Sequence, residues 1–231
     1  RKTISIEEIG RTVKSVLANR EIRSTISAIK GVGGNAQYQA VSVTDTEALN
    51  AVCEQVRVEF GSITGFVHGA GVLADKLITQ KTLGQFQRVF DTKVEGLRAL
   101  LAVTKDDSLR VISMFSSVAA RCGNTGQCDY AMANEILNKV AQSLAKQRPD
   151  CLVKSLGWGH WDGGMVSPQL RSHFSKMGVP MIPLDVGGAM LTDELSGSEA
   201  ERVELVLGGE PVQRALMSVD NSTALQMEIR I

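Results

Sequence analysis

A serine and a tyrosine thirteen positions apart stand in the stretch FSSVAARCGNTGQCDYAMAN, residues 115–134. A tyrosine phenol can act as a general acid, and a serine hydroxyl can donate a hydrogen bond. A tyrosine acid works best beside a cation, because a nearby positive charge lowers the phenol pKa. One helical turn after the tyrosine stands Asn134 rather than a lysine. The site is therefore either disabled or supplied with its cation from elsewhere in the chain.

Further residues that could face a ligand follow the apolar segments of the chain. They are His68-Gly69-Ala70-Gly71, Ser116-Ser117, Tyr130 and Gly157-Trp158-Gly159. Taken singly, a glycine after a strand is usually a turn residue and a serine pair is usually a helix cap. Their shared position, just beyond strand ends, is where ligands bind in open parallel sheets.

The elements that must position these residues alternate between helix and strand. Ser5 and Glu8 form a capping-box pattern that opens the first helix, and Thr82 with Gln85 opens another. We expect helices over about residues 6–30, 44–61, 82–103, 130–147 and 166–177, and strands over 36–43, 63–71, 109–117, 151–159 and 203–209. This alternation predicts an α/β fold with a doubly wound, Rossmann-like parallel sheet. We expect residues 1–231 to be one domain, with about 210–231 as a C-terminal extension.

The glycine run GVGGNA, residues 31–36, does not suit a dinucleotide phosphate loop. Such a loop follows a strand and opens a helix, whereas here a helix precedes the glycines and a strand is expected after them. We interpret the run as a helix C-cap and turn. The first strand, glycine loop and first helix of a dinucleotide fold would then lie upstream of this chain.

The composition argues against some classes of binding partner and indicates the cellular compartment. With 25 basic and 25 acidic side chains among 231 residues, the net charge argues against nucleic acid or an anionic membrane as the main partner. No apolar run approaches the roughly 20 residues that span a bilayer, and the N-terminus RKTISIEEIG is no secretory signal. The chain lacks an initial Met, so we expect a piece of a longer cytoplasmic protein. Its four cysteines, without C-x-x-C spacing, favour free thiols over a metal site or disulfides.

In this order, the motifs resemble the short-chain dehydrogenase/reductase superfamily. The similarity is greater to the ketoreductase domains of polyketide synthases and polyunsaturated fatty acid synthases. It is carried by VHGAGVLADKLI, FDTKVEGLRALL, FSSVAA, YAMAN and GWGHWDGGM, and it runs over most of the chain. In these ketoreductases the catalytic lysine and asparagine exchange places, so the lysine comes from the preceding helix. The resemblance thus implies Lys93 as the cation and Asn134 in the vacated place.

The physics makes this exchange reasonable. Lowering a phenol pKa from near 10 to about 7 requires about 4 kcal/mol. One ammonium about 4 Å away supplies roughly that at an effective dielectric constant near 20. The position of the cation matters, and the helix that supplies it does not.

The resemblance further implies NADPH as hydride donor to the β-carbon of a 3-ketoacyl thioester. This substrate would be held on the phosphopantetheine arm of an acyl carrier protein, beside the other domains of a synthase. Tyr130 would be the general acid, Ser117 would bind the carbonyl oxygen, Lys93 would tune Tyr130, and Asn134 would hold a water or backbone group in the proton path. The implied cofactor contacts are Ser42, Val43, His68, Gly69, Ala70, Gly71, Lys93, Tyr130, Gly157, Trp158 and Gly159.

A few positions bear on the stereochemistry of the product or differ from the residues that are usual in the family. Leu73-Ala74-Asp75 resembles the Leu-Asp-Asp pattern of ketoreductases that form the D-hydroxy product, and Cys122 stands where the opposite hand has tryptophan. Ser42 replaces an aspartate that contacts adenine in relatives, and His160 replaces a proline. We interpret both His68 and His160 as residues that shape the backbone.

Two other functions remain open from the sequence. One is an inactive, reductase-like domain that serves as scaffold or docking surface in a megasynthase; the presence of Ser117, Tyr130 and Lys93 argues against it. The other is a stand-alone alcohol or steroid reductase, which would favour lysine at position 134.

Overall fold

The computed structural model describes residues 5–197, 199–208 and 229–230. The chain divides into two compact units, Arg1–Val41 and Ser42–Ile231. A single domain over residues 1–231 stays a prediction. Of the extension expected at 210–231, residues 210–228 and 231 lie outside the described residues.

The first unit contains helix α1, Ile6–Gly31. The Ser5 hydroxyl accepts a hydrogen bond from the Glu8 amide at 3.1 Å, as the capping pattern predicts. After the helix, Gly33 has φ of 84° and donates its amide to the Lys30 carbonyl at 3.0 Å. The interpretation of the glycine run as a C-cap and turn is confirmed, since a left-handed residue ends the helix.

The strand expected over residues 36–43 is wrong, because these residues have no regular secondary structure. A strand exists only where a neighbouring strand accepts and donates its backbone hydrogen bonds. Within the described parts of the chain, no strand pairs with this segment. Its apolar residues alone do not make it a strand.

The second unit is built on a parallel sheet in the order β1-β2-β3-β4-β5. The strands are β1 Gly65–His68, β2 Val111–Ser117, β3 Leu152–Trp158, β4 Glu204–Leu207 and the two-residue β5 Ile229–Arg230. Four of them fall where the sequence predicts strands. Order in space follows order along the chain, so each crossover carries the chain one strand further.

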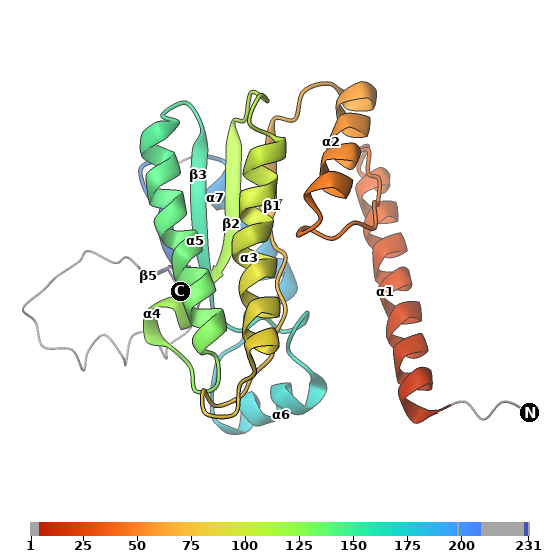
Figure 1. Cartoon of the computed structure of the whole chain (residues 1–231), viewed down its shortest axis with the longest axis vertical. Coiled ribbons are helices and arrows are strands. Elements are labelled where there is room, and N and C mark those ends of the chain that lie inside the picture. Colours follow the sequence, from red (N-terminus) through yellow and green to blue (C-terminus); the bar gives the residue numbers. More distant parts are fainter. Residues whose placement is uncertain (1–4, 198, 209–228, 231) are drawn as a thin grey trace, which may run out of the picture. The chain divides into compact units, whose positions relative to one another are not determined.

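Helices cover both faces of this sheet, as Figure 1 shows, with α3 and α5 in front of β2 and β3 and α7 behind them. The helices of this unit are α2 Thr46–Phe60, α3 Leu83–Val103, α4 Ala119–Cys122, α5 Cys128–Gln147, α6 Pro168–Lys176 and α7 Leu184–Leu195. One core lies between the sheet and α3 and α5; it includes Leu97, Ile112 and Leu137. A second core includes Leu156, Trp158 and Ile182. The doubly wound α/β fold is confirmed.

Helix α3 begins where the sequence predicts. Thr82 accepts from the Gln85 amide at 3.2 Å, and the Gln85 side chain accepts from the Thr82 amide at 3.1 Å. This capping box fixes the start of the helix that carries Lys93 three turns later.

Helix α7 was not predicted, because Gly187 and Gly188 near its start disfavour a helix. Packing explains the first of them. A Cβ at Gly187 would lie 2.3 Å from the ring of Trp161, so only glycine lets the helix approach that indole.

Strand β1 pairs with β2 on one side, and no other described strand pairs with it. Val67 in its middle is 46% exposed. In the unit Ser42–Ile231, β1 is therefore an edge strand with an apolar side chain open to solvent.

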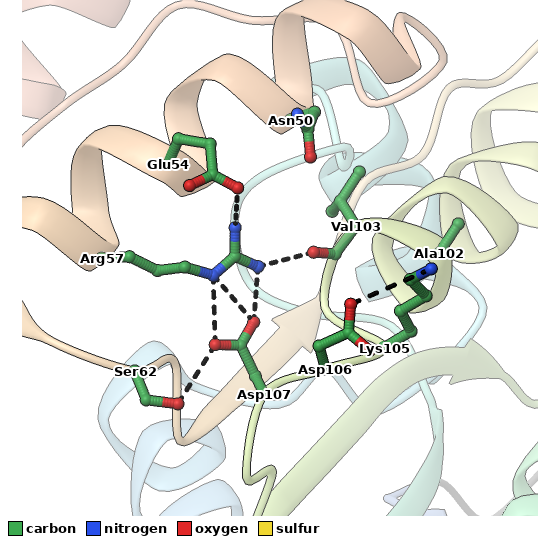
Figure 2. A pocket seen from close by; sticks show the side chains of 9 residues that line it. All are labelled: Asn50, Glu54, Arg57, Ser62, Ala102, Val103, Lys105, Asp106 and Asp107. Carbon is green, nitrogen blue, oxygen red and sulfur yellow. Dashed lines mark hydrogen bonds and ion pairs between the residues drawn. The ribbon is translucent and has the colours of Figure 1, made fainter.

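A cavity of about 450 Å³ opens at the amino-terminal end of the strands, away from the residues expected to do chemistry. Figure 2 shows its lining, which comes from α2, from the C-terminal end of α3 and from the turns that precede β1 and β2. Its charged side chains are Glu54, Arg57, Lys105, Asp106 and Asp107. Both signs are present, and the arginine is already bound to a carboxylate, so the cavity carries no evident preference for an ion.

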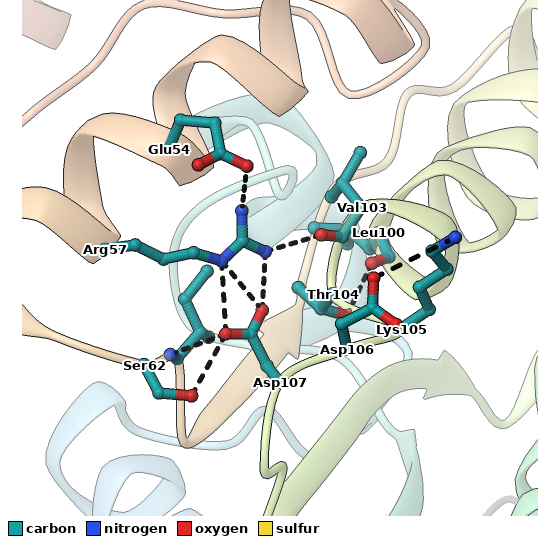
Figure 3. Close-up of polar contacts among 10 residues, drawn as sticks. Glu54, Arg57, Ser62, Leu100, Val103, Thr104, Lys105, Asp106 and Asp107 are labelled. Carbon is teal, nitrogen blue, oxygen red and sulfur yellow. Dashed lines mark hydrogen bonds and ion pairs between the residues drawn. The ribbon is translucent and has the colours of Figure 1, made fainter.

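Arg57 joins these elements through its guanidinium group (Figure 3). Its Nε donates to Asp107 Oδ1 at 3.1 Å, and its Nη2 donates to the Val103 carbonyl at 2.6 Å. Asp107 also accepts from the Ser62 hydroxyl at 3.1 Å and the Ile63 amide at 3.0 Å. The Arg57–Asp107 pair thus links α2, the C-terminal end of α3 and the segment that precedes β1. The hydrogen bonds from Arg57 hold the pKa of Asp107 below its ordinary value.

We expect Asp107→Asn to lower the midpoint of thermal unfolding at neutral pH. A depressed carboxyl pKa contributes stability above the ordinary pKa and loses it as the pH falls through the native value. The difference from wild type should therefore shrink in acid, measured as unfolding midpoints across pH. Asp106→Asn is the matched control, since that side chain is 89% exposed and should change little. Equal effects of both substitutions would contradict this assignment.

None of the helices that the structure describes combines the length and the apolar composition needed to cross a membrane. Among the same described residues, no group of three or more His, Cys, Asp or Glu side chains is placed to hold a metal ion.

Candidate active site

The carboxyl ends of three neighbouring strands meet at one edge of the sheet. His68 of β1 is in register with Met114 of β2, and Ser117 at the end of β2 is in register with Trp158 of β3. The residues that the sequence analysis placed after these strands therefore share one region. The side chains of α3 and α5 complete it.

Lys93 projects from α3 into this region and is only 3% exposed. Its Nζ donates to the Phe115 carbonyl of β2 at 2.7 Å and lies 5.8 Å from the centre of the Tyr130 ring. Burial lowers the pKa of Lys93 to about 8. The structure thus brings together the two side chains that the sequence analysis paired across separate helices.

Tyr130 lies in the first turn of α5 and is half-buried. Its pKa is raised, mainly because burial disfavours the tyrosinate; hydrogen bonding with the Ser117 and Asn134 side chains opposes the rise, and the charge of Asp75 adds to it. This direction is opposite to the lowered pKa expected from Lys93. The groups that shift the Tyr130 pKa do not include Lys93, whose ammonium is bound to the Phe115 carbonyl and lies 5.8 Å from the centre of the Tyr130 ring.

The two serines that end β2 have different partners. Ser116 is buried and donates its hydroxyl to the Asn134 carbonyl at 3.1 Å, which holds α5 against the strand. The Ser117 hydroxyl accepts from the Ala119 amide at 3.2 Å and is near enough to the Tyr130 phenol to oppose the rise in its pKa. Ser117 is thereby the serine placed at the phenol.

Asn134 is fully buried one turn after Tyr130. Its Nδ2 donates to the Tyr130 carbonyl at 2.8 Å. The side chain is near enough to the phenol to affect its pKa, yet Oδ1 has no partner of normal hydrogen-bond geometry in the described part of the chain. Buried polar atoms are nearly always satisfied, so this oxygen is an acceptor available to a water or a ligand.

His68 and the glycines after β1 shape the region. The His68 ring is buried, which lowers its pKa to about 4, and its Nε2 donates to the Lys93 carbonyl at 2.9 Å. A Cβ at Gly71 would lie 3.2 Å from Lys93 Cε and 3.5 Å from Nζ, so glycine leaves room for the lysine. Gly69 is exposed and Ala70 half-buried.

Ser42 and Val43 lie at the start of this unit. The Ser42 hydroxyl pairs with that of Thr44 at 2.9 Å. Val43 packs against α3 at Gly96, where a Cβ would lie 2.1 Å from a Val43 methyl group and 3.3 Å from His68. Val43 is thus held beside the helix that carries Lys93.

Gly157, Trp158 and Gly159 have close partners within the fold. A Cβ at Gly159 would lie 2.8 Å from the Gly208 carbonyl, which is too close without a shift of the backbone. A Cβ at Gly157 would lie 3.1 Å from the Leu205 carbonyl of β4, a tight contact that favours glycine. The Trp158 ring packs in the core, 4.7 Å from the ring of Trp161. The structure does not bring the Trp158 side chain to the phenol.

Asp75 lies near Tyr130, since its charge affects the phenol pKa, and its Oδ2 accepts from Gln127 at 2.8 Å. His160 stacks on Phe174 with ring centres 4.3 Å apart, which suits a structural role.

A buried ion pair between Lys81 and Asp129, next to Tyr130, was not predicted from the sequence. The only indication of this pair in the sequence is the position of Asp129 directly before Tyr130.

Comparisons with known proteins show the family to which the chain belongs. A family model of the KR domain matches residues 6–163. The chain belongs to the ketoreductase domain family. Members of this family are short-chain-type oxidoreductases that reduce ketoacyl intermediates and use a nicotinamide cofactor. The recognition made from the motifs is confirmed.

This chain is 40% identical over 196 residues to a polyunsaturated fatty acid synthase protein of Thraustochytrium sp., covering 84% of the chain and 7% of that protein. Among solved structures it resembles an N-terminal ketoreductase from the macrolactin assembly line, with 26% identity, a TM-score of 0.69 and coverage of 81% of this chain and 36% of that one. A ketoreductase domain from the bacillaene assembly line shares 27% identity with a TM-score of 0.67, covering 87% and 46%. This chain therefore spans less than a tenth of that synthase protein and less than half of either solved chain.

Proposed function

We propose that this ketoreductase chain takes part in the NADPH-dependent reduction of a 3-ketoacyl thioester to the D-3-hydroxyacyl thioester. The acyl chain would be carried by the phosphopantetheine arm of an acyl carrier protein, within a multidomain polyketide or polyunsaturated fatty acid synthase in the cytoplasm. The observation that carries the proposal is the meeting of Lys93, Tyr130 and Ser117 from α3, α5 and β2 at one edge of the sheet.

The residues at this edge suit the nicotinamide end of the cofactor. Among the described residues, a Cβ at Gly69 would have only one heavy atom within 4 Å, a Phe115 ring carbon at 3.9 Å, so the backbone there is open to a flat ring. Lys93 uses one ammonium hydrogen on the Phe115 carbonyl and has others for a ribose hydroxyl. Bound NADPH supplies the hydride. Val43, Gly69, Ala70 and Gly71 would line the cofactor, and Ser42, Gly157, Trp158 and Gly159 are further contacts that the family resemblance implies.

Tyr130 acts as the general acid that protonates the substrate oxygen as negative charge develops on it. Its raised pKa keeps the phenol protonated at neutral pH, so the proton is present when it is needed. Ser117 donates its hydroxyl hydrogen to the same oxygen and orients the carbonyl. Asn134 offers its unpartnered Oδ1 to a water that returns a proton toward Tyr130.

The hand of the product is proposed from the loop after β1. Asp75 lies near the phenol, and Leu73-Ala74-Asp75 resembles the fingerprint of D-specific ketoreductases. A substrate that enters past this loop presents one face of its ketone to the hydride donor.

The proposal is tested in the longest natural polypeptide that contains this chain. A 3-ketoacyl thioester is supplied with NADPH or NADH, cofactor oxidation is followed, and the product is resolved by chiral chromatography. We expect D-alcohol formation with NADPH preferred. The L-alcohol would overturn the stereochemical assignment, and absence of reduction with every cofactor would favour the alternative of an inactive docking domain.

A further inference from the structure

Lys81 and Asp129 form a buried ion pair directly beside the catalytic tyrosine. Lys81 Nζ donates to Asp129 Oδ2 at 2.7 Å, and the two side chains are only 3% and 1% exposed. Lys81 comes just before the N-cap of α3, and Asp129 is the residue before Tyr130 in α5. Neither residue belongs to the set Lys93, Ser117, Tyr130 and Asn134.

The ammonium of Lys81 reaches a second segment as well. It donates to the Ala74 carbonyl at 2.9 Å, in the loop that leads to Asp75. On the other side of the pair, Asp129 Oδ1 accepts from the Tyr130 amide at 2.9 Å. One lysine thus connects the backbone before Asp75 to the carboxylate that holds the backbone of Tyr130.

Two further hydrogen bonds join the same segments, residues 73–81 and residues 123–129. The Lys76 amide donates to the Gly126 carbonyl at 3.0 Å, and Gln127 Nε2 donates to Asp75 Oδ2 at 2.8 Å. Gly126 has φ of 85°, and a Cβ there would lie 3.4 Å from the Lys76 amide nitrogen. Both the conformation and the close approach favour glycine at this crossing.

A buried ion pair is a poor device for stability alone, because desolvation of two charges offsets most of their attraction. Replacing such a pair by well-packed apolar side chains of similar size is often neutral or stabilising. What the pair supplies is a fixed geometry, since three directional contacts from one ammonium-carboxylate pair determine where two segments lie.

We propose that Lys81 and Asp129 are positioning residues that set the loop bearing Asp75 against Tyr130 and so determine how the ketone is presented to the phenol. This inference rests on the proposed function. The pair acts through the backbone of residues 74–76 and 129–130 and does not touch the reacting atoms. Its loss should therefore affect turnover and product hand more than cofactor binding.

The test uses the double substitution Lys81→Met and Asp129→Asn in the natural polypeptide. Removing only the lysine would leave an unpaired buried carboxylate and endanger folding. The asparagine keeps an oxygen that can accept from the Tyr130 amide. The matched control is Lys154→Met with Glu194→Gln, which removes another buried pair, 3.3 Å apart with side chains 0% and 5% exposed, between β3 and α7.

The first measurement is amide hydrogen exchange, which does not depend on activity. The Lys76 amide reports the contact between the two segments, and the Ile182 amide, bonded to the His160 carbonyl at 2.7 Å, is the internal reference. In the Lys81/Asp129 variant we expect the Lys76 amide to exchange faster than in wild type and the Ile182 amide to exchange at the wild-type rate. In the control variant we expect the Lys76 amide to exchange at the wild-type rate. Wild-type exchange at Lys76 in the Lys81/Asp129 variant would overturn the proposal.

The second measurement is the kinetics and chirality of ketone reduction. We expect kcat of the Lys81/Asp129 variant to fall about tenfold to a hundredfold, with KM for NADPH little changed and with more of the L-alcohol in the product. The control should keep the wild-type product ratio. Wild-type kcat and chirality in the Lys81/Asp129 variant would overturn the inference. If the wild-type protein reduces no ketoacyl thioester, the proposed function fails, and the exchange at Lys76 alone decides whether the pair positions the loop.

Discussion

Tyr130→Phe is expected to lower kcat for ketone reduction by about a thousandfold, with cofactor binding and the unfolding midpoint close to wild type. Loss of a positioned general acid costs roughly a hundredfold to ten thousandfold, and phenylalanine keeps the ring that packs beside Lys93. Steady-state kinetics with a 3-ketoacyl thioester and titration of cofactor binding measure the two effects separately. Burial already raises the pKa of the phenol, so the hydroxyl serves as a proton donor and not as a stable anion.

The matched control is Tyr38→Phe, which removes the same atom from a tyrosine that is 56% exposed in the other unit. We expect wild-type kcat from this variant. If Tyr130→Phe also retained wild-type turnover, the proton would have to come from another group and the proposed role of Tyr130 would fall.

Lys93→Met is expected to lower kcat by about a hundredfold and to remove the alkaline limb of the pH–rate profile. In the wild-type protein, burial lowers the pKa of Lys93 to about 8, so its charge is lost as the pH rises through that value and turnover should decline there. The raised pKa of Tyr130 keeps the phenol protonated over this range, so Tyr130 does not account for the decline. The residual activity of the methionine variant should be flat between about pH 7 and 9.

Stability distinguishes this titration from unfolding. The native pKa of Lys93 is below that of the unfolded chain, so the unfolded state binds more protons between about pH 8 and 10.5. The contribution of Lys93 to the free energy of unfolding therefore rises with pH over the range where activity falls. An alkaline limb near pH 8 that survives in Lys93→Met would assign the titration to a different group.

Local signals in the sequence predicted most of the elements because each depends on neighbouring residues. The capping box of Thr82 and Gln85 fixes the start of α3, and the glycine at position 33 ends α1 in a left-handed turn. Residues 36–43 were predicted wrongly because a strand depends on a partner that its own residues do not specify. Helix α7 was missed because Gly187 is explained only by its close contact with Trp161. These two residues are 26 positions apart in the sequence, so no local pattern shows the contact.

The sequence likewise predicted some features of the site and not others. Pairing Lys93 with Tyr130 came from the resemblance to a family in which lysine and asparagine exchange places, and the structure places the two side chains together. The direction of the Tyr130 pKa was wrong because no sequence pattern shows that the ammonium is bound to a backbone carbonyl. Lys81 and Asp129 are 48 positions apart, and neither stands in a motif that links them.

The open side of β1 has a practical consequence for handling the unit Ser42–Ile231 by itself. The outer backbone amides and carbonyls of β1 lack partners among the described strands, and the Val67 side chain is exposed. Another extended chain can therefore pair with this strand. Preparations of this unit should therefore self-associate as concentration rises. The substitution Val67→Lys, whose charge repels a second copy on that side, is the simplest way to keep it monodisperse.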